Sequence, residues 1–288
     1  IVYLDPDFET PSEWKYALGL TWETEAGYLI TADAQMTRGD DTAIYKHGDL
    51  EQIGTNDFGN GYPIYDSVRL PTFVLTNSSV GNESESFAVS VFKNFENGLD
   101  MRVGYAWVDS KDVNPMTSSV AFSNYTNRAF YDPEEEVLST SNYNIEHRVT
   151  AVLNYNVNLF GSYNTRFSLF GQSSSGTPYS LTLGGFEGTG LAYGFTPYLD
   201  FKEHVLVEPG TRNDRQGSSW TKADLRISQE LPGLNQEHSA RAFVVIDNVT
   251  NLLNDDWGVL YKPNFPYGVT QEDLDAGRAA LCLDRDRE

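Results

Sequence analysis

The sequence has little of three things that mark common protein classes: cysteine, basic residues and long apolar runs. The 288 residues include one cysteine, Cys282, which excludes an intrachain disulfide framework and a cysteine-cluster metal site. Lys and Arg number 20 against 41 Asp and Glu, a net charge of −21 that argues against binding nucleic acid. No apolar run approaches the ~18–20 residues of a membrane helix, and the mean hydropathy is −0.43. A helical membrane protein is therefore excluded.

The chain is instead rich in aromatic residues and glycine. Aromatic residues make up 13% of it, and there are 24 glycines. This composition is too aromatic for a disordered acidic chain and is typical of β-structure interrupted by turns.

Apolar and polar residues alternate with a period of two over unusually long stretches, which predicts β-strands. Several of these stretches run for about ten residues, enough for a tilted strand to cross a bilayer, whereas an ordinary strand has about five or six. The eight predicted strands fall at about 14–23, 28–37, 72–95, 99–108, 148–157, 166–169, 222–227 and 241–247.

Short and long connections between these strands alternate along the chain. The turns at 25–27, 96–98, 159–163 and 231–238 are short, while the connections at 38–71, 110–145, 174–218 and beyond 249 are long and polar. The pattern favours an all-β fold, an antiparallel transmembrane β-barrel with short periplasmic turns and long extracellular loops. A soluble secreted β-sandwich that serves as a binding module is the alternative, because its strands also alternate.

The alternation assigns side chains to two faces. The apolar parity carries aromatic residues that we expect to face lipid or form interfacial girdles: Trp14, Tyr16, Trp22, Tyr28, Tyr105, Trp107 and Tyr155. The opposite parity carries charges that we expect to face the lumen, where they cross-link the barrel wall or contact a plug or substrate. These are Lys15, Asp33, Asp100, Arg102, Arg148, Arg166, Lys222, Asp224 and Arg226.

Four segments resemble TonB-dependent outer-membrane receptors. Residues 247–254 (DNVTNLLN) resemble the segment that follows the penultimate barrel strand, and 75–99 resemble a strand-turn-strand of the family. Residues 113–121 and 254–258 are similar to the Oar-like branch.

The resemblance implies that residues 1–265 are a C-terminal portion of the receptor barrel. Residues 266–288 are then an irregular tail or extracellular loop, with the closing strand missing, and a plug domain and TonB box lie upstream. It implies a transporter in a Gram-negative outer membrane that takes up a scarce extracellular substrate with energy from the TonB complex, without a cofactor. An Oar-like adhesin or surface-assembly barrel and a passive porin are the alternatives.

No motif predicts an enzyme. The glycines of 184–190 lack the following helix that a phosphate-binding loop needs, and no Gly-x-Ser-x-Gly elbow occurs. The four histidines have no zinc-ligand spacing. The acidic run 132–136 lacks the spaced ligands of a calcium loop, so we expect a solvated loop. With Asp40, Asp41, Asp49 and Glu51 it hints at a cationic or metal-chelate substrate, and a saline habitat is an equally good explanation of these acidic residues.

Overall fold

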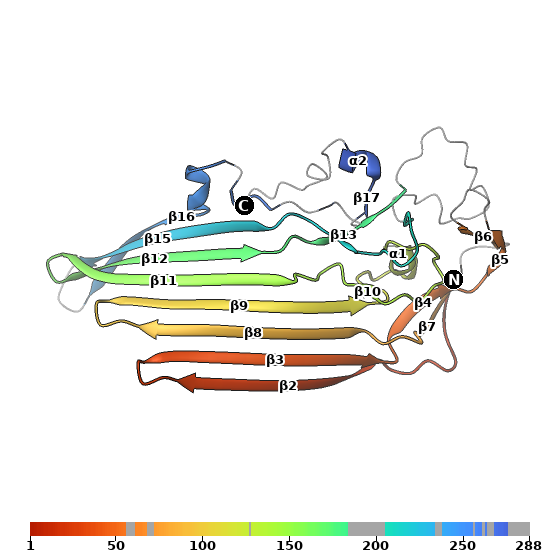
Figure 1. Cartoon of the computed structure of the whole chain (residues 1–288), viewed down its shortest axis with the longest axis horizontal. Helices are drawn as coiled ribbons and strands as arrows, with labels where there is room; N and C mark the ends of the chain where they lie inside the picture. Colours follow the sequence, from red (N-terminus) through yellow and green to blue (C-terminus); the bar gives the residue numbers. More distant parts are fainter. Residues whose placement is uncertain are drawn as a thin grey trace.

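The computed structural model describes residues 1–55, 61–67, 72–126, 128–183, 205–233, 238–255, 257–260, 263 and 268–275. Eight long strands form one antiparallel sheet in which each strand pairs with the next long strand along the chain (Figure 1). All eight predicted strands are present. They are β2 (Ser12–Glu23), β3 (Tyr28–Asp40), β8 (Glu83–Asn94), β9 (Leu99–Asp112), β11 (His147–Phe160), β12 (Tyr163–Ser174), β15 (Trp220–Pro232) and β16 (Ser239–Ile246).

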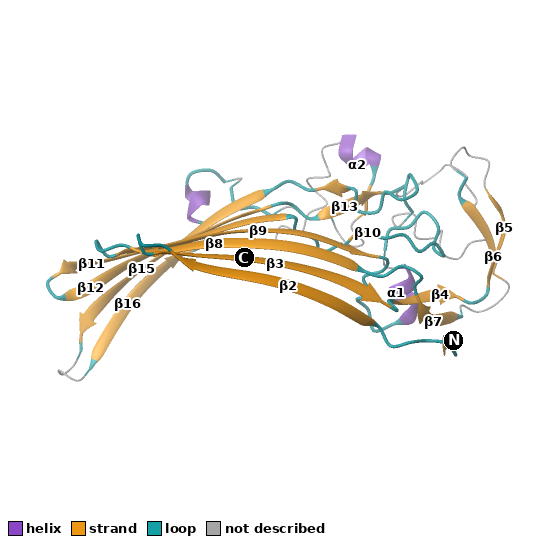
Figure 2. Ribbon diagram, turned by 60° about the horizontal axis from the view of Figure 1, so that its bottom comes forward, coloured by secondary structure: helices purple, strands orange, loops and turns teal. Residues whose placement is uncertain are grey.

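The all-β, antiparallel prediction is confirmed, and so is the alternation of connections. Short turns join the strands at one end of the sheet, and long connections emerge at the other (Figure 1). Glycine allows the turns at Gly27 and Gly98, where φ is 75° and 88°. The sheet curves and twists but does not close among the described residues, because β2 and β16 each pair on one side only (Figure 2).

The long connections are folded, which the sequence pattern did not predict. They form what we call the loop layer, which contains the small sheets β1-β7-β4, β5-β6 and β14-β13-β17 and the helix α1, packed against β4. The short strands and helices of the chain, in this layer and outside it, are β1 (Val2–Leu4), β4 (Ala43–His47), β5 (Leu50–Thr55), β6 (Pro63–Ser67), β7 (Phe73–Asn77), α1 (Ala121–Thr126), β10 (Ser139–Thr140), β13 (Pro178–Leu181), β14 (Arg215–Gln216), η2 (Val249–Leu252), β17 (Gly268–Val269) and α2 (Gln271–Asp275).

Among the residues that the structure describes, the buried hydrophobic side chains lie in this layer and not under the long sheet. Tyr62, Tyr65, Phe130 and Val205 pack together in one cluster. Phe73, Ala121 and Tyr125 form another cluster. Separately, the described residues include no helix that is long and apolar enough to span a membrane. The loop layer is therefore a small globular body carried on one end of the sheet.

One strand prediction needs correction: 72–95 is two strands and not one. β7 ends at Asn77 and pairs with β1 and β4 in the loop layer, whereas β8 begins at Glu83 in the long sheet. The chain changes sheet at Gly81, where an added Cβ would lie 2.0 Å from the carbonyl oxygen of Gly39. Only glycine permits this backbone approach.

Gly81→Ala is therefore expected to destabilise the junction by about 1–3 kcal/mol, because the methyl group overlaps backbone that cannot move aside cheaply. Gly171→Ala is the matched control, since an added Cβ at that position meets nothing within 4 Å. The substitution there should not destabilise the fold, because alanine reduces the conformational freedom of the unfolded chain. Chemical denaturation of both variants checks this. Equal stability of the two would show that the approach at Gly81 is not tight.

The segment 266–288, expected to be an irregular tail or an extracellular loop, contains the short elements β17 and α2, and β17 pairs in parallel with β13. Residues 276–288 lie outside the described part.

Candidate functional site

One face of the long sheet is apolar and exposed. Strand register places Leu20, Ala32, Val89 and Tyr105 in one row across β2, β3, β8 and β9. On the edge strand β2 the exposed fraction reaches 76% at Leu18. The register also places all the predicted aromatic residues on this face: Trp14, Tyr16, Trp22, Tyr28, Tyr105, Trp107 and Tyr155.

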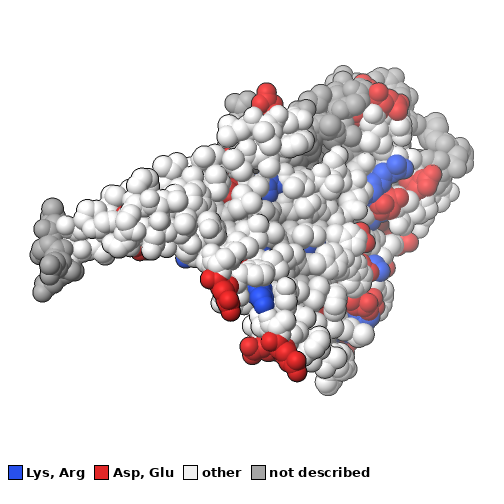
Figure 3. Space-filling model, turned by 60° about the vertical axis from the view of Figure 1, so that its left-hand side comes forward, with Lys and Arg blue, Asp and Glu red and all other residues white. Residues whose placement is uncertain are grey.

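Charged side chains mark both ends of the apolar face. At the loop end, Arg38, Glu83 and Lys111 form one row across β3, β8 and β9, and Arg38 binds Glu85 at 2.5 Å. Near the turns, Lys93 lies 4.5 Å from the centre of the Tyr28 ring. Figure 3 shows an expanse without charge between acidic and basic side chains at the two ends.

The opposite face is polar. The register places on it every charge that was predicted to face a lumen: Lys15, Asp33, Asp100, Arg102, Arg148, Arg166, Lys222, Asp224 and Arg226. The structure does not bring these nine into one cluster.

Several of them have partners within the wall. Lys222 lies 3.6 Å from Asp224, and Asp100 accepts a hydrogen bond from the Asn154 amide at 2.8 Å. Arg226 stacks over the Phe243 ring at 4.6 Å. These contacts agree with the cross-linking interpretation of the charges.

Asp33 and Arg148 are arranged differently. They belong to one row, separated by Ala88 and Ala106, and all four line a hollow of about 300 Å³ on the polar face.

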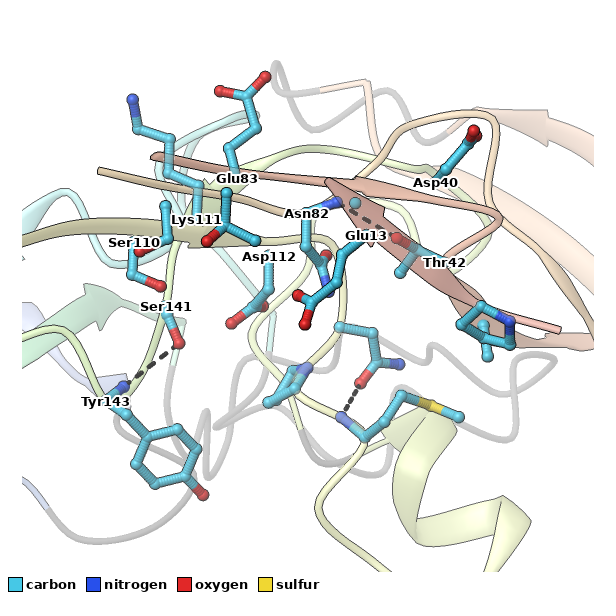
Figure 4. A pocket seen from close by; sticks show the side chains of 18 of the residues that line it. Glu13, Asp40, Thr42, Asn82, Glu83, Ser110, Lys111, Asp112, Ser141 and Tyr143 are labelled. Atoms are coloured by element: carbon cyan, nitrogen blue, oxygen red, sulfur yellow. Dashed lines mark hydrogen bonds between the residues drawn. The ribbon is translucent and has the colours of Figure 1, made fainter. Parts of the chain in front are cut away.

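A larger recess of about 560 Å³ lies where the polar face meets the loop layer (Figure 4). Its floor comes from the loop ends of β2, β3, β8 and β9, and its walls come from the connections near 114–116 and 141–143. In Figure 4, Glu13 and Asp112 extend to one side of the strands and Glu83 and Lys111 to the other. The lining residues are Pro11, Ser12, Glu13, Thr37, Gly39, Asp40, Thr42, Ala43, Asn82, Glu83, Ser84, Ser110, Lys111, Asp112, Asn114, Pro115, Met116, Ser141 and Tyr143.

Asp112, the last residue of β9, joins the recess to the segment 205–218, which we call the strap. Arg212 of the strap donates to the Asp112 carboxylate at 2.9 Å and to the Ser139 carbonyl at 3.4 Å. The two side chains are only 4% and 11% exposed. Asn213 donates to Thr140 O at 2.7 Å. The strap is therefore fastened across the ends of β9 and β10.

The acidic run 132–136, expected to be a solvated loop, instead binds the loop layer together. Asp132 accepts from the Tyr65 hydroxyl at 2.7 Å, and Glu134 accepts from the Tyr125 hydroxyl at 2.6 Å. Burial raises the pKa of Glu134. Glu136 forms an ion pair with Lys46 and accepts from two serines.

The bonds to Glu136 make the loop layer sensitive to acid. Burial raises the pKa of Glu136, but Lys46, Ser79 and Ser78 outweigh it and hold that pKa at about 2, below the ordinary 4.5. A carboxyl whose pKa is lower in the folded state stabilises the fold above its unfolded pKa. The Glu136 contribution is therefore complete above about pH 4.5 and is lost as the pH falls toward 2.

Glu136→Gln tests this. The stability difference between the parent protein and this variant is expected to shrink as the pH falls from 5 to 2, measured by the protease resistance of the loop layer. A difference that stays constant over this range would show that the Glu136 pKa is not lowered.

The recess residues Asp112 and Tyr143, and Arg212 of the strap, were not singled out from the sequence, because no alternation or motif marks them. Among the described residues no group of three His, Cys, Asp or Glu is placed to hold a metal ion. The glycines of 184–190 lie outside the described residues.

No protein-family model and no curated protein matches the chain. Among solved structures, the chain is similar to that of the outer membrane transporter YddB from Escherichia coli, with 14% identity and a TM-score of 0.49. The match covers 85% of this chain and 29% of that one, so the chain spans less than a third of the length of that structure.

Proposed function

We propose that this chain forms part of the wall of an outer-membrane β-barrel, in a TonB-dependent receptor of the Oar-like branch that takes up a scarce extracellular substrate. The observation that carries the proposal is the continuous apolar face of the long sheet. On β8 that face runs from Glu85 to Lys93, charged residues about 26 Å apart along the strand. An apolar band of about 25 Å is what a barrel presents to lipid.

The exposure of this face favours a membrane over a soluble sandwich. A sandwich covers the apolar face of each sheet with a second sheet about 10 Å away. Here Leu18, Leu20 and Trp22 are 58–76% exposed, and the buried core lies at the end of the strands. An apolar surface this large is costly in water and favourable in lipid.

The polar face supports the rest of the proposal. In a barrel this face lines the lumen, so the recess lies at the loop end of the substrate path.

The edges at β2 and β16 require further strands to satisfy their backbone groups in lipid. The TonB complex supplies energy through a plug, lipid surrounds the wall, and no bond is made or broken in the substrate.

The test uses the full-length protein produced in a Gram-negative host with and without a functional TonB complex. We expect it in the outer-membrane fraction, soluble only with detergent, and we expect growth on limiting nutrient to require both the receptor and TonB. Recovery in solution without detergent would support the sandwich. Membrane location with TonB-independent permeation would support a porin. Membrane location with surface attachment and no uptake would support an adhesin.

A further inference from the structure

We propose that the recess binds a neutral, polyhydroxylated ligand, an oligosaccharide segment, and not a cation or metal chelate. This inference rests on the proposed function, since it names the substrate class of the same site. It departs from the hint that the abundant acidic residues give, because the structure shows how those acids are used.

The first step is the charge balance of the recess. Glu13 forms an ion pair with Lys15 at 2.6 Å, and Asp112 forms one with buried Arg212 at 2.9 Å. Figure 4 shows Asp40, Glu83 and Lys111 extending away from Glu13 and Asp112, on the other side of the strands. The Asp112 carboxylate is therefore neutralised by a buried partner, and the Glu13 carboxylate has a solvent-exposed cation beside it.

The second step is the cost of a cationic ligand. A cation bound to Asp112 would compete with the guanidinium of Arg212 for the carboxylate. That guanidinium is buried, and its Nη1 atom already has no hydrogen-bond partner among the described residues. Displacing a buried guanidinium from its carboxylate leaves an uncompensated charge. A hydroxyl that donates to the same carboxylate adds a hydrogen bond and leaves the pair intact.

The third step is the mixture of polar groups. The recess offers the hydroxyls of Thr37, Ser84 and Ser110, which form one row on the polar face, beside the carboxylate oxygens of Glu13 and Asp112. Hydroxyls both donate and accept, and carboxylates only accept. A sugar hydroxyl also does both, whereas an ammonium group only donates.

The fourth step is an apolar platform. The Tyr143 side chain lines the recess and is 60% exposed. The flat apolar ring of Tyr143 suits the C–H face of a sugar. The hydroxyl groups at the edge of the sugar would then face the polar side chains of the recess. A cavity of about 560 Å³ lies within the range of small-ligand sites.

The experiment measures binding to the full-length protein in detergent by titration calorimetry. The neutral probes are maltohexaose, cellohexaose and laminarihexaose. The glucosamine hexamer is the cationic probe, and a ferric catecholate is the chelate probe. We expect at least one neutral hexasaccharide to bind more tightly than either charged probe.

Variants locate the binding and identify its chemistry. Tyr143→Ala is expected to weaken saccharide binding about tenfold, and Tyr143→Phe to retain it within about threefold, because the ring remains. Glu13→Gln is expected to stay within about threefold, because the amide oxygen still accepts. Glu96→Gln is the matched control that changes nothing, because Glu96 is exposed in the turn between β8 and β9, at the opposite end of the sheet from the recess.

Two results would overturn the inference. One is tighter binding of the glucosamine hexamer or the chelate than of every neutral hexasaccharide. The other is no saccharide binding, or binding that Tyr143→Ala leaves unchanged. Both leave the receptor proposal standing if the protein is in the outer membrane and uptake requires TonB, so the two failures are distinguishable.

Discussion

Val89→Arg is expected to lower the free energy of unfolding in a bilayer by about 2–4 kcal/mol, the cost of a cation on the lipid face at midplane. Val89 lies midway between Glu85 and Lys93 on the apolar face, between Ala32 and Tyr105 of the neighbouring strands. Lipid offers the new guanidinium no hydrogen-bond partner. The side chain can find partners only by extending along the apolar face of the sheet to the membrane–water interface.

The matched control is Ala88→Arg, one residue away on the polar face. Ala88 lies beside Asp33 on β3, so the new cation gains a carboxylate neighbour and water. Its effect is expected to stay within about 0.5 kcal/mol, as for most substitutions at solvated positions. Reversible unfolding in detergent micelles or vesicles gives both values. Equal small effects at the two positions would show that the apolar face does not contact lipid.

Arg212→Ala is expected to destabilise the loop layer by about 3–5 kcal/mol, the cost of removing one partner from a buried ion pair. The Asp112 carboxylate, 11% exposed, then remains buried without its guanidinium. The strap also loses its bond to the Ser139 carbonyl. Hydrogen exchange in the strap and β10 should rise, while exchange in the centres of β8 and β9 should not.

Arg241→Ala provides the comparison. Arg241 pairs with Glu230 at 3.0 Å, but the two side chains are 58% and 40% exposed. Such a surface pair contributes about 0–1 kcal/mol. Effects of similar size from the two variants would mean that the Arg212 pair is solvated, and the strap would not be a fixed part of the site.

The long sheet could be predicted from sequence because it is built from local information. A strand that faces two different environments must alternate, so Phe87, Val89 and Val91 opposite Ala88 and Ser90 reveal both the strand and its faces. The glycines at 27 and 98 mark the turns for a similar local reason, since positive φ favours glycine.

The loop layer could not be predicted in this way, because its order comes from contacts between distant residues. The Tyr62 hydroxyl donates to Leu206 O across 144 positions, and Arg212 binds Asp112 across 100. No periodicity marks such residues. The error at 72–95 has a related cause: the alternation is clear only at 87–91, and only the approach of Gly39 to Gly81 shows where the chain changes sheet.

Spin labels at successive positions of β8 test the central claim most directly. In the full-length protein with its native cysteines, including Cys282, replaced by serine, single cysteines at residues 87–92 are labelled and the protein is placed in vesicles. We predict a period of two: labels at 87, 89 and 91 are accessible to oxygen dissolved in lipid, and those at 88, 90 and 92 are not. Labels equally accessible to a water-soluble nickel chelate at all six positions would contradict a membrane-spanning sheet.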